Sequence, residues 1–237
     1  MFHVKHTYMT SKFELEETKT ILHSALKANS IDAPVDINKL LNYLCILAEW
    51  NKIHNLTSHR SLNDIIFKDI IDSLIAAKHL NGILANCKYV MDFGAGAGFS
   101  GVVISLLHQN IEVTFSEASR KKANFIRQVM LDLKIDGKVQ CGFLDSSKKD
   151  LFNRFDLIIG RAVTQVPDFI CTVQNYVHNK GHLAYMAGPN QILEIENPKQ
   201  GVELETIIPY TILPYNYFRK LAVYKKNIVS RETDTTH

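Results

Sequence analysis

Apolar residues repeat at helical spacing through the first eighty residues of the chain. They lie three or four positions apart in three successive segments, with turn-forming residues between the segments. This period predicts helices from Ser11 to about Asn29, from about Asp36 to Trp50 and from about Ser61 to Leu80. The Asn81-Gly82 pair that follows marks a break. We therefore expect a small N-terminal helical cap over residues 11–82.

Apolar runs of strand length alternate with helical segments in the rest of the chain. Strands are predicted at residues 88–93, 111–116, 138–143, 155–160, 181–187, 202–209 and 219–225, and helices at 98–109, 119–134, 165–178 and 190–197. Such alternation is typical of an α/β fold with a mostly parallel, doubly wound, Rossmann-like sheet. No helical pattern separates the last two strands, so we expect them to form an antiparallel hairpin. This domain should cover residues 83–227, with disordered tails at 1–10 and 228–237.

Composition and charge exclude several classes of protein. The chain is 46% hydrophobic and 22% charged, which is typical of a globular protein, and its net charge of +3 would tolerate a polyanionic partner. No apolar run approaches the ~20 residues of a membrane span, and no signal peptide is visible. The four cysteines form no CxxC pair, and the ten histidines show no metal-ligand spacing. We predict a cytoplasmic protein without membrane contact or a metal site.

A glycine-rich stretch follows the first predicted strand. It reads YVMDFGAGAGFSG and places glycine at Gly94, Gly96 and Gly98. A strand, a glycine turn and a helix N-terminus are how Rossmann-like sheets bind nucleotide-like cofactors, because glycine lets backbone N–H groups approach a ligand closely. Phe99 follows the last of these glycines, and we expect it to lie against the cofactor rather than in the core.

The acid Asp92 stands just before the glycine turn. A carboxylate here would repel the pyrophosphate of a nicotinamide dinucleotide, whereas it would attract the ammonium and sulfonium groups of S-adenosylmethionine (SAM). It could also orient the amides of the glycine turn, or simply cap that turn. The predicted terminal hairpin is also how the fold of SAM-dependent methyltransferases ends. Both features favour SAM over NAD as the cofactor.

Further candidate cofactor ligands follow the second, third and fourth predicted strands. Glu117 lies 23 residues after Gly94, near the place of a ribose-binding acid, although a helix N-terminus alone would also favour it. Leu144 and Asp145 would lie over an adenine, or in an ordinary loop. Arg161 follows the fourth strand, where a guanidinium can hold a phosphate or a base edge, or pair with a neighbouring acid.

The motifs that are missing after the fourth strand also bear on the chemistry. The segment reads FDLIIGRAV and contains neither the Asn-Pro-Pro-Tyr motif of enzymes that methylate exocyclic amines nor a Pro-Cys pair. We therefore assign no catalytic acid, base or nucleophile. Basic residues at Arg120, Lys121 and Lys122, and again at Arg219 and Lys220, would suit an RNA phosphate backbone, although a solvated helix face is the default explanation of such runs.

Three segments together resemble the RsmG (GidB) family of bacterial 16S rRNA methyltransferases. They are WNKIHNLTSHRSLNDIIFKDIIDSL (Trp50–Leu74), DFGAGAGFSG (Asp92–Gly101), and SRKKANFIRQV (Ser119–Val129) with GRAV (Gly160–Val163). The resemblance implies SAM-dependent methylation of guanine N7 in 16S rRNA, in the guanine 527 loop near the decoding centre. It also implies 16S rRNA or the small ribosomal subunit as partner.

The resemblance carries over to single residues as well. It implies that Gly94 and Phe99 belong to the SAM-binding loop, that Leu144 and Asp145 contact adenine, and that Arg161 is a cofactor- or substrate-side arginine. Guanine N7 already offers a free lone pair, so alignment and electrostatics suffice and no general base is needed.

Two positions depart from the family pattern. Ala187 stands where the family has a lysine after the fifth strand, and Asp69 where it has a histidine. If that lysine holds phosphate, either Arg219 or Lys220 replaces it or the affinity for rRNA is weaker. The alternatives to an active monomeric methyltransferase are a catalytically silent SAM- or RNA-binding module and an NAD-linked oxidoreductase.

Overall fold

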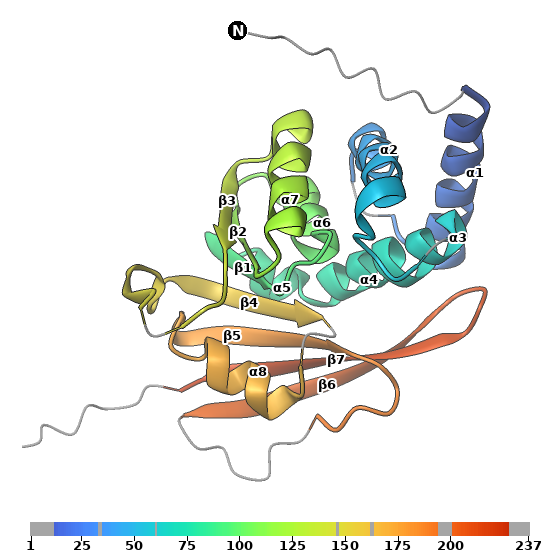
Figure 1. Ribbon diagram of the computed structural model, residues 1–237. Helices are drawn as coiled ribbons and strands as arrows, with labels where there is room; N and C mark the ends of the chain where they lie inside the picture. The colour runs from blue at the N-terminus through green and yellow to red at the C-terminus, as the bar shows by residue number, and fades with distance from the viewer. Residues whose placement is uncertain are drawn as a thin grey trace, which may run out of the picture.

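A seven-stranded sheet forms the centre of the computed structural model, which describes residues 12–32, 35–59, 61–145, 147–161, 164–193 and 201–227 (Figure 1). The predictions for the two tails therefore lie outside the described residues. The strand order is β3-β2-β1-β4-β5-β7-β6. The strands are β1 (Tyr89–Phe93), β2 (Glu112–Glu117), β3 (Gly137–Cys141), β4 (Phe155–Arg161), β5 (Val177–Ala187), β6 (Val202–Ile212) and β7 (Tyr217–Lys226).

Strands β1 to β5 pair in parallel, and β7 is antiparallel to both of its neighbours. This confirms the mostly parallel sheet with a terminal antiparallel hairpin. The chain starts at β1, moves outward to β3 and returns to β4 beside β1. Ligands of such sheets bind at this reversal, beyond the carboxyl ends of the strands.

The N-terminal region consists of helices, as predicted. They are α1 (Lys12–Ala28), α2 (Ile37–His54), α3 (Leu62–Ile65), the π-helix η1 (Ile66–Ile71), α4 (Asp72–His79) and α5 (Asn81–Leu84). Asp36 caps α2, because its Oδ1 accepts from the N–H groups of Asn38 and Lys39. The helix runs past Trp50 to His54, so the turn expected there begins later.

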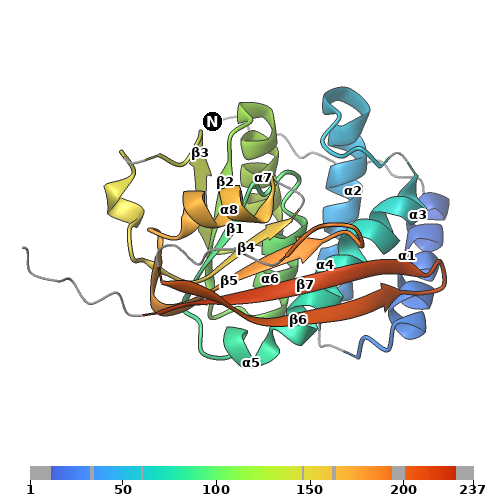
Figure 2. The same cartoon turned by 90° about the horizontal axis from the view of Figure 1, so that it is seen from below.

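Helices cover both faces of the sheet. Helices α6 (Phe99–Leu107) and α7 (Arg120–Leu133) share one buried cluster with the N-terminal helices, whereas α8 (Val166–Val173) packs with a second cluster on the other face (Figures 1 and 2). A single 3-10 turn, η2 (Lys149–Leu151), precedes β4. Residues 190–193 are not helical, and the rest of the helix predicted at 190–197 lies outside the described residues. Among the described helices, none is long and apolar enough to cross a bilayer.

The helical cap packs directly against the glycine turn. The side chain of Tyr43 in α2 is fully buried, and its hydroxyl donates to the carbonyl of Ala97 over 2.8 Å. The same ring lies edge-on to Phe99, and Trp50 lies edge-on to Phe125 in α7. The cap thus fixes the turn that begins α6.

The start of α6 lies unusually close to the sheet. A Cβ atom on Gly101 would stand 2.3 Å from the Phe115 ring and 2.9 Å from Oδ2 of Asp92. Only glycine fits at this position. The close approach brings the first turn of α6 within hydrogen-bond reach of the end of β1.

Candidate cofactor site

A cavity of about 360 Å³ opens at the carboxyl ends of β1, β2 and β4. It lies at the sheet's reversal point, between the glycine turn and the turn that follows α2 in the helical cap. Its lining residues are Leu56, Thr57, Ser58, Asp92, Gly94, Ala95, Gly96, Ala97, Phe99, Ser100, Glu117, Lys122 and Arg161. The structure therefore brings most of the cofactor ligands predicted from the sequence together in this one cavity.

The glycine turn adopts a conformation that requires glycine. Gly94, Gly96 and Gly98 all have φ in the left-handed region, at 64°, 60° and 82°. The amide of Ala95 donates to the carbonyl of Ser116 at the end of β2. The turn is thus held against β2, and its backbone borders the cavity.

Asp92 combines deep burial with a single amide partner. Its side chain is 3% exposed, and its Oδ2 accepts from the N–H of Gly101 over 2.8 Å. Burial raises the pKa of Asp92 to about 7, against the opposing effects of this hydrogen bond and of the nearby Arg161 guanidinium. The carboxyl group orients the first turn of α6, one of the uses expected from the sequence, and it remains in contact with the cavity.

Glu117 holds two separate segments in register. Its Oε2 accepts from the N–H of Gly96 and its Oε1 from the N–H of Ser119, each over 2.7 Å. The carboxylate thereby joins the glycine turn to the start of α7. Because each carboxylate oxygen has two lone-pair sites, Glu117 can still accept further hydrogen bonds from a diol in the cavity.

Arg161 is tied to acids of the helical cap. Its guanidinium forms an ion pair with Asp69 of η1 and lies 3.6 Å from Oδ2 of Asp72 in α4. It also lies over the ring of Phe99, 5.3 Å from the centroid. Burial lowers the pKa of Arg161, but the carboxylates of Asp69 and Asp72 outweigh this effect and raise it. The sequence left two roles open for Arg161, pairing with a neighbouring acid or contacting a ligand. The structure is consistent with both, since the guanidinium pairs with acids and also borders the cavity.

Phe99 only partly meets its prediction. Its ring lines the cavity, but it is 6% exposed and belongs to the buried cluster beneath the cap. The expectation that it would lie outside the core is wrong, because Tyr43 packs against it from α2. One ring serves both the core and the cavity wall.

Leu144 and Asp145 lie apart from this cavity. Leu144 packs against the cluster around α8, and Asp145 is exposed, with its Oδ1 accepting from Ser147. The carbonyl of Asp145 accepts from the hydroxyl of Tyr176, whose own carbonyl accepts from the N–H groups of Arg154 and Phe155 at the amino end of β4. Their contact with adenine stays a prediction.

The residues predicted to bind RNA are spread over two regions. Lys122 lines the cavity, and Arg120 and Lys121 are exposed at the start of α7. In β7, Arg219 lies 3.7 Å from Oδ2 of Asp72, whereas Lys220 pairs in register with Ala187. Of the two possible replacements for the family lysine, Lys220 is thus the residue placed beside position 187.

The sequence prediction did not assign cavity-lining roles to Leu56, Thr57 and Ser58. They follow α2 and form the cavity wall that comes from the cap. The Asn51 side chain fixes this turn by accepting from the N–H groups of Leu56 and Thr57. The turn-forming residues in this segment predicted a turn. They did not predict that the turn would lie beside the glycine loop.

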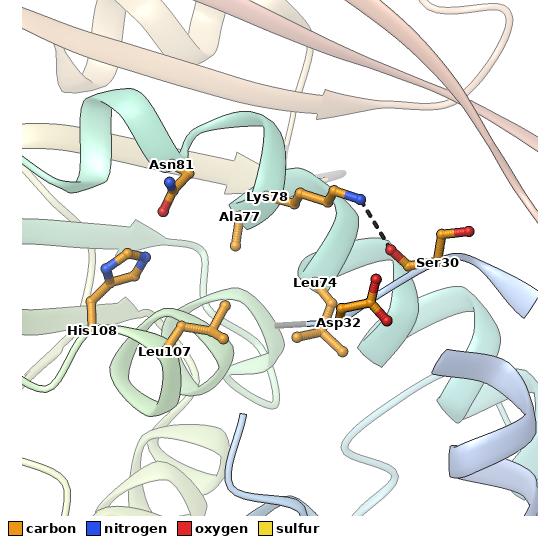
Figure 3. A pocket seen from close by; sticks show the side chains of 8 residues that line it. All are labelled: Ser30, Asp32, Leu74, Ala77, Lys78, Asn81, Leu107 and His108. Atoms are coloured by element: carbon orange, nitrogen blue, oxygen red, sulfur yellow. Dashed lines mark hydrogen bonds between the residues drawn. The ribbon is translucent and has the colours of Figure 1, made fainter. Parts of the chain in front are cut away.

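A further cavity of about 400 Å³ lies at the opposite end of α6 (Figure 3). Leu74, Ala77 and Leu107 form its apolar part, and Asp32 and His108 also line it. The nine residues of α6 separate it from the glycine turn by about 13 Å. It therefore does not belong to the cofactor site.

The chain also matches known proteins in sequence. The profile of a family described as rRNA small subunit methyltransferase G (GidB) matches residues 36–219. The chain belongs to this family. The resemblance inferred from three sequence segments is thereby confirmed, and membership in a methyltransferase family argues against an NAD-linked oxidoreductase.

Two curated members of the family illustrate the degree of likeness. Both are named ribosomal RNA small subunit methyltransferase G. The protein from Methylobacillus flagellatus is 31% identical over 193 residues, which cover 79% of this chain and 90% of that protein. The protein from Nitrosomonas europaea is 30% identical over 211 residues, which cover 86% and 95%.

Solved structures confirm the fold. An O-methyltransferase from Bacillus cereus, described in complex with SAH, aligns with a TM-score of 0.60 over 88% of this chain and 100% of that one, at 14% identity. The Rossmann-like fold of class I SAM-dependent methyltransferases, expected from the strand order and the terminal hairpin, is therefore correct for this member of the family.

Proposed function

We propose that this protein transfers the methyl group of SAM to N7 of a guanine in 16S rRNA. One observation carries the proposal: in a member of the small-subunit rRNA methyltransferase family, a glycine turn and two buried acids line one cavity at the sheet's reversal point. The names of the relatives support the RNA substrate. The loop around guanine 527 is the target that the sequence resemblance implies.

The lining residues match the chemical groups of SAM. Gly94 and Gly96 of the turn allow close approach of a ligand to the backbone, Asp92 would attract the ammonium group, and Glu117 would accept from the ribose diol. When bound, SAM supplies an electrophilic methyl group on its sulfonium. Phe99 and Arg161 close the cavity on the side of the cap.

The site favours methylation of a ring nitrogen that needs no deprotonation. Asp92 and Glu117 are engaged with backbone amides, so both act in binding and positioning. Guanine N7 attacks with its own lone pair and becomes cationic. Nearby carboxylates lower the cost of that charge, and alignment supplies most of the rate.

We propose that the protein acts as a monomer, and that it acts in the cytoplasm because its proposed substrate is ribosomal RNA. The basic residues Arg120, Lys121, Lys122 and Lys220 would contact RNA phosphates. Arg219 would contribute less, because it lies beside the buried Asp72.

The test is methyl transfer from labelled SAM to small ribosomal subunits and to naked 16S rRNA that lack the modification. The proposal expects incorporation into one of these substrates, and chemical cleavage at N7-methylguanine would locate the product. SAM binding without transfer to either substrate would instead favour the catalytically silent module. Transfer to a different atom or a different RNA would overturn the proposed specificity.

A further inference from the structure

A pocket separate from the cofactor cavity lies between the segment after β5 and the β6–β7 hairpin. It has a volume of about 360 Å³ and shares no lining residue with the cofactor site. Its lining residues are Pro189, Asn190, Gln191, Ile192, Leu193, Ile207 and Lys220. Of these residues, only Lys220 has a role in the proposed function, as a contact to an RNA phosphate.

The hairpin places an aromatic ring and a cation on the same face as the pocket. Successive side chains of a strand point to opposite faces, and Ala222 and Tyr224 of β7 are buried in the cluster around α8. Lys220 and Phe218 continue this face at two-residue intervals. Phe218 is 63% exposed, so its ring is accessible to a ligand on this face.

The other wall of the pocket is fixed by hydrogen bonds of Gln191. Its Oε1 accepts from the N–H of Gly188 over 2.8 Å, and its Nε2 donates to the Tyr185 hydroxyl over 3.0 Å. The Tyr185 hydroxyl donates in turn to the carbonyl of Thr164, just after β4. This network holds Ile192 outward with 77% of its surface exposed, so the apolar contact surface exists before any ligand binds.

The pocket lies close to the proposed site of methylation. Arg161, which lines the cofactor cavity, pairs in register with Met186 of β5, and the next residue, Ala187, pairs with Lys220 of β7. Two inter-strand spacings therefore separate the backbones of β4 and β7, which is about 10 Å. Arg161 shares the cap face of the sheet with Met186, whereas Ala187 and Lys220 lie on the α8 face. An RNA strand whose reactive base lies at the cofactor cavity would therefore reach the pocket by crossing the carboxyl edge of the sheet.

We propose that this pocket binds an unpaired nucleotide of the RNA substrate next to the methylated guanine. Its base stacks on Phe218 and contacts Ile192 and Ile207, and Lys220 contacts its phosphate. Aromatic rings with a nearby cation are the usual means of binding single-stranded nucleic acid, whereas a protein partner would not require the cation. This inference rests on the proposed RNA substrate and adds a second contact point to it.

The test measures binding of the full-length protein to a short fluorescent single-stranded RNA at several salt concentrations. We expect Phe218→Ala to lower affinity by about 5- to 150-fold, while Phe218→Tyr, which keeps the ring, binds like the wild type. Lys220→Gln should reduce the salt slope by about 0.7, the contribution of one phosphate contact on a single strand. Leu131→Ala, which removes an equally exposed apolar side chain from α7, is the matched control and should change neither.

Methyl transfer by the same proteins separates this inference from the proposed function. A wild-type enzyme that methylates rRNA, together with a Phe218→Ala variant that binds RNA equally well, would overturn the nucleotide pocket alone. Loss of activity of Phe218→Ala on ribosomal subunits, with RNA binding unchanged, would point to a ribosomal protein as the occupant and also overturn it. Ring-dependent RNA binding without methyl transfer would uphold the pocket and reject the activity.

Discussion

Arg161 of β4 and Asp69 of η1 form an ion pair that joins the sheet to the helical cap at the edge of the cofactor cavity. The Asp69 side chain is fully buried, and its second oxygen lies 3.0 Å from Nδ1 of His59. Asp72 lies between Arg161 and Arg219, within 3.7 Å of both guanidinium groups. The acid found in place of the family's histidine is thus the centre of a charge network.

Removing the Asp69 charge should destabilise the protein. Asp69→Asn leaves Arg161 without its main counter-charge, and breaking a buried ion pair from one side typically costs about 3 kcal/mol or more. The free energy of unfolding in urea measures this loss. Asp64→Asn is the control, because Asp64 pairs with Lys68 at the surface and the substitution should leave stability nearly unchanged.

A double-mutant cycle would then show whether the pair itself is responsible. We expect Arg161→Met and Asp69→Leu together to cost less than the sum of the two single changes, since the double variant leaves no unpaired charge between them. Strict additivity would contradict the coupling inferred from the structure.

The carboxyl group of Asp92 should make stability depend on pH. Its pKa is about 7 in the folded state and about 3.9 in the unfolded chain, so the folded state holds this proton more tightly. Stability from this group is therefore present below about pH 4 and is lost as pH rises to about 7. Asp92→Asn removes the effect, and we expect it to exceed the wild type in stability by up to about 4 kcal/mol at pH 8 while binding SAM more weakly.

Urea unfolding of both proteins at pH 5 and pH 8 tests this expectation. Because all other titrating groups are shared, the difference between wild type and variant isolates Asp92. A difference that stays constant between the two pH values would show that the folded-state pKa of Asp92 is not raised.

Glutamine at position 117 should not support SAM binding as glutamate does. The two carboxylate oxygens of Glu117 each accept from a backbone N–H, those of Gly96 and Ser119. A glutamine amide would turn an NH2 donor toward one of these donors, so one hydrogen bond is lost and two donors oppose each other. We expect Glu117→Gln to weaken SAM binding by about tenfold or more in calorimetry.

The control for Glu117 lies at the other end of the same strand. Glu112→Gln weakens ion pairs with Lys138 and Arg154, far from the cavity lining. It should leave SAM affinity unchanged. Equal effects of the two substitutions on SAM binding would indicate a general disturbance of β2 rather than a specific role for Glu117.

Local patterns predicted the sheet and the glycine turn because their signals lie within a few residues of one another. The alternation of apolar runs with helical segments predicted the strands. The spacing of Gly94, Gly96 and Gly98 predicted a turn, and its positive φ values require glycine. The same reasoning placed Asp92 and Glu117 at strand ends. In a parallel sheet those ends meet at one edge, so their convergence followed from topology.

Features that depend on long-range packing were not predictable in the same way. The π-helix of η1 carries the apolar spacing of an ordinary helix, so the turn that presents Asp69 to Arg161 leaves no sequence signal. Phe99 was expected at the cofactor because of its position beside the glycines, but its burial is decided by Tyr43, which is distant in the sequence. Contacts of this kind become visible only once the cap is placed over the sheet.

Lysine at position 187 should not improve RNA binding in this chain. From the family pattern alone, Ala187→Lys would restore a missing phosphate contact, but Ala187 is 1% exposed and lies directly opposite Lys220 in the antiparallel pair. A second ammonium there would be partly buried beside a like charge, which destabilises a sheet. We expect Ala187→Lys to lower the unfolding temperature without raising RNA affinity, and the combined Ala187→Lys and Lys220→Ala exchange to recover most of the stability. Thermal unfolding measures the stability, and a salt titration measures RNA binding. If the single Ala187→Lys variant binds RNA more tightly at every salt concentration, Lys220 does not occupy the place of the family lysine.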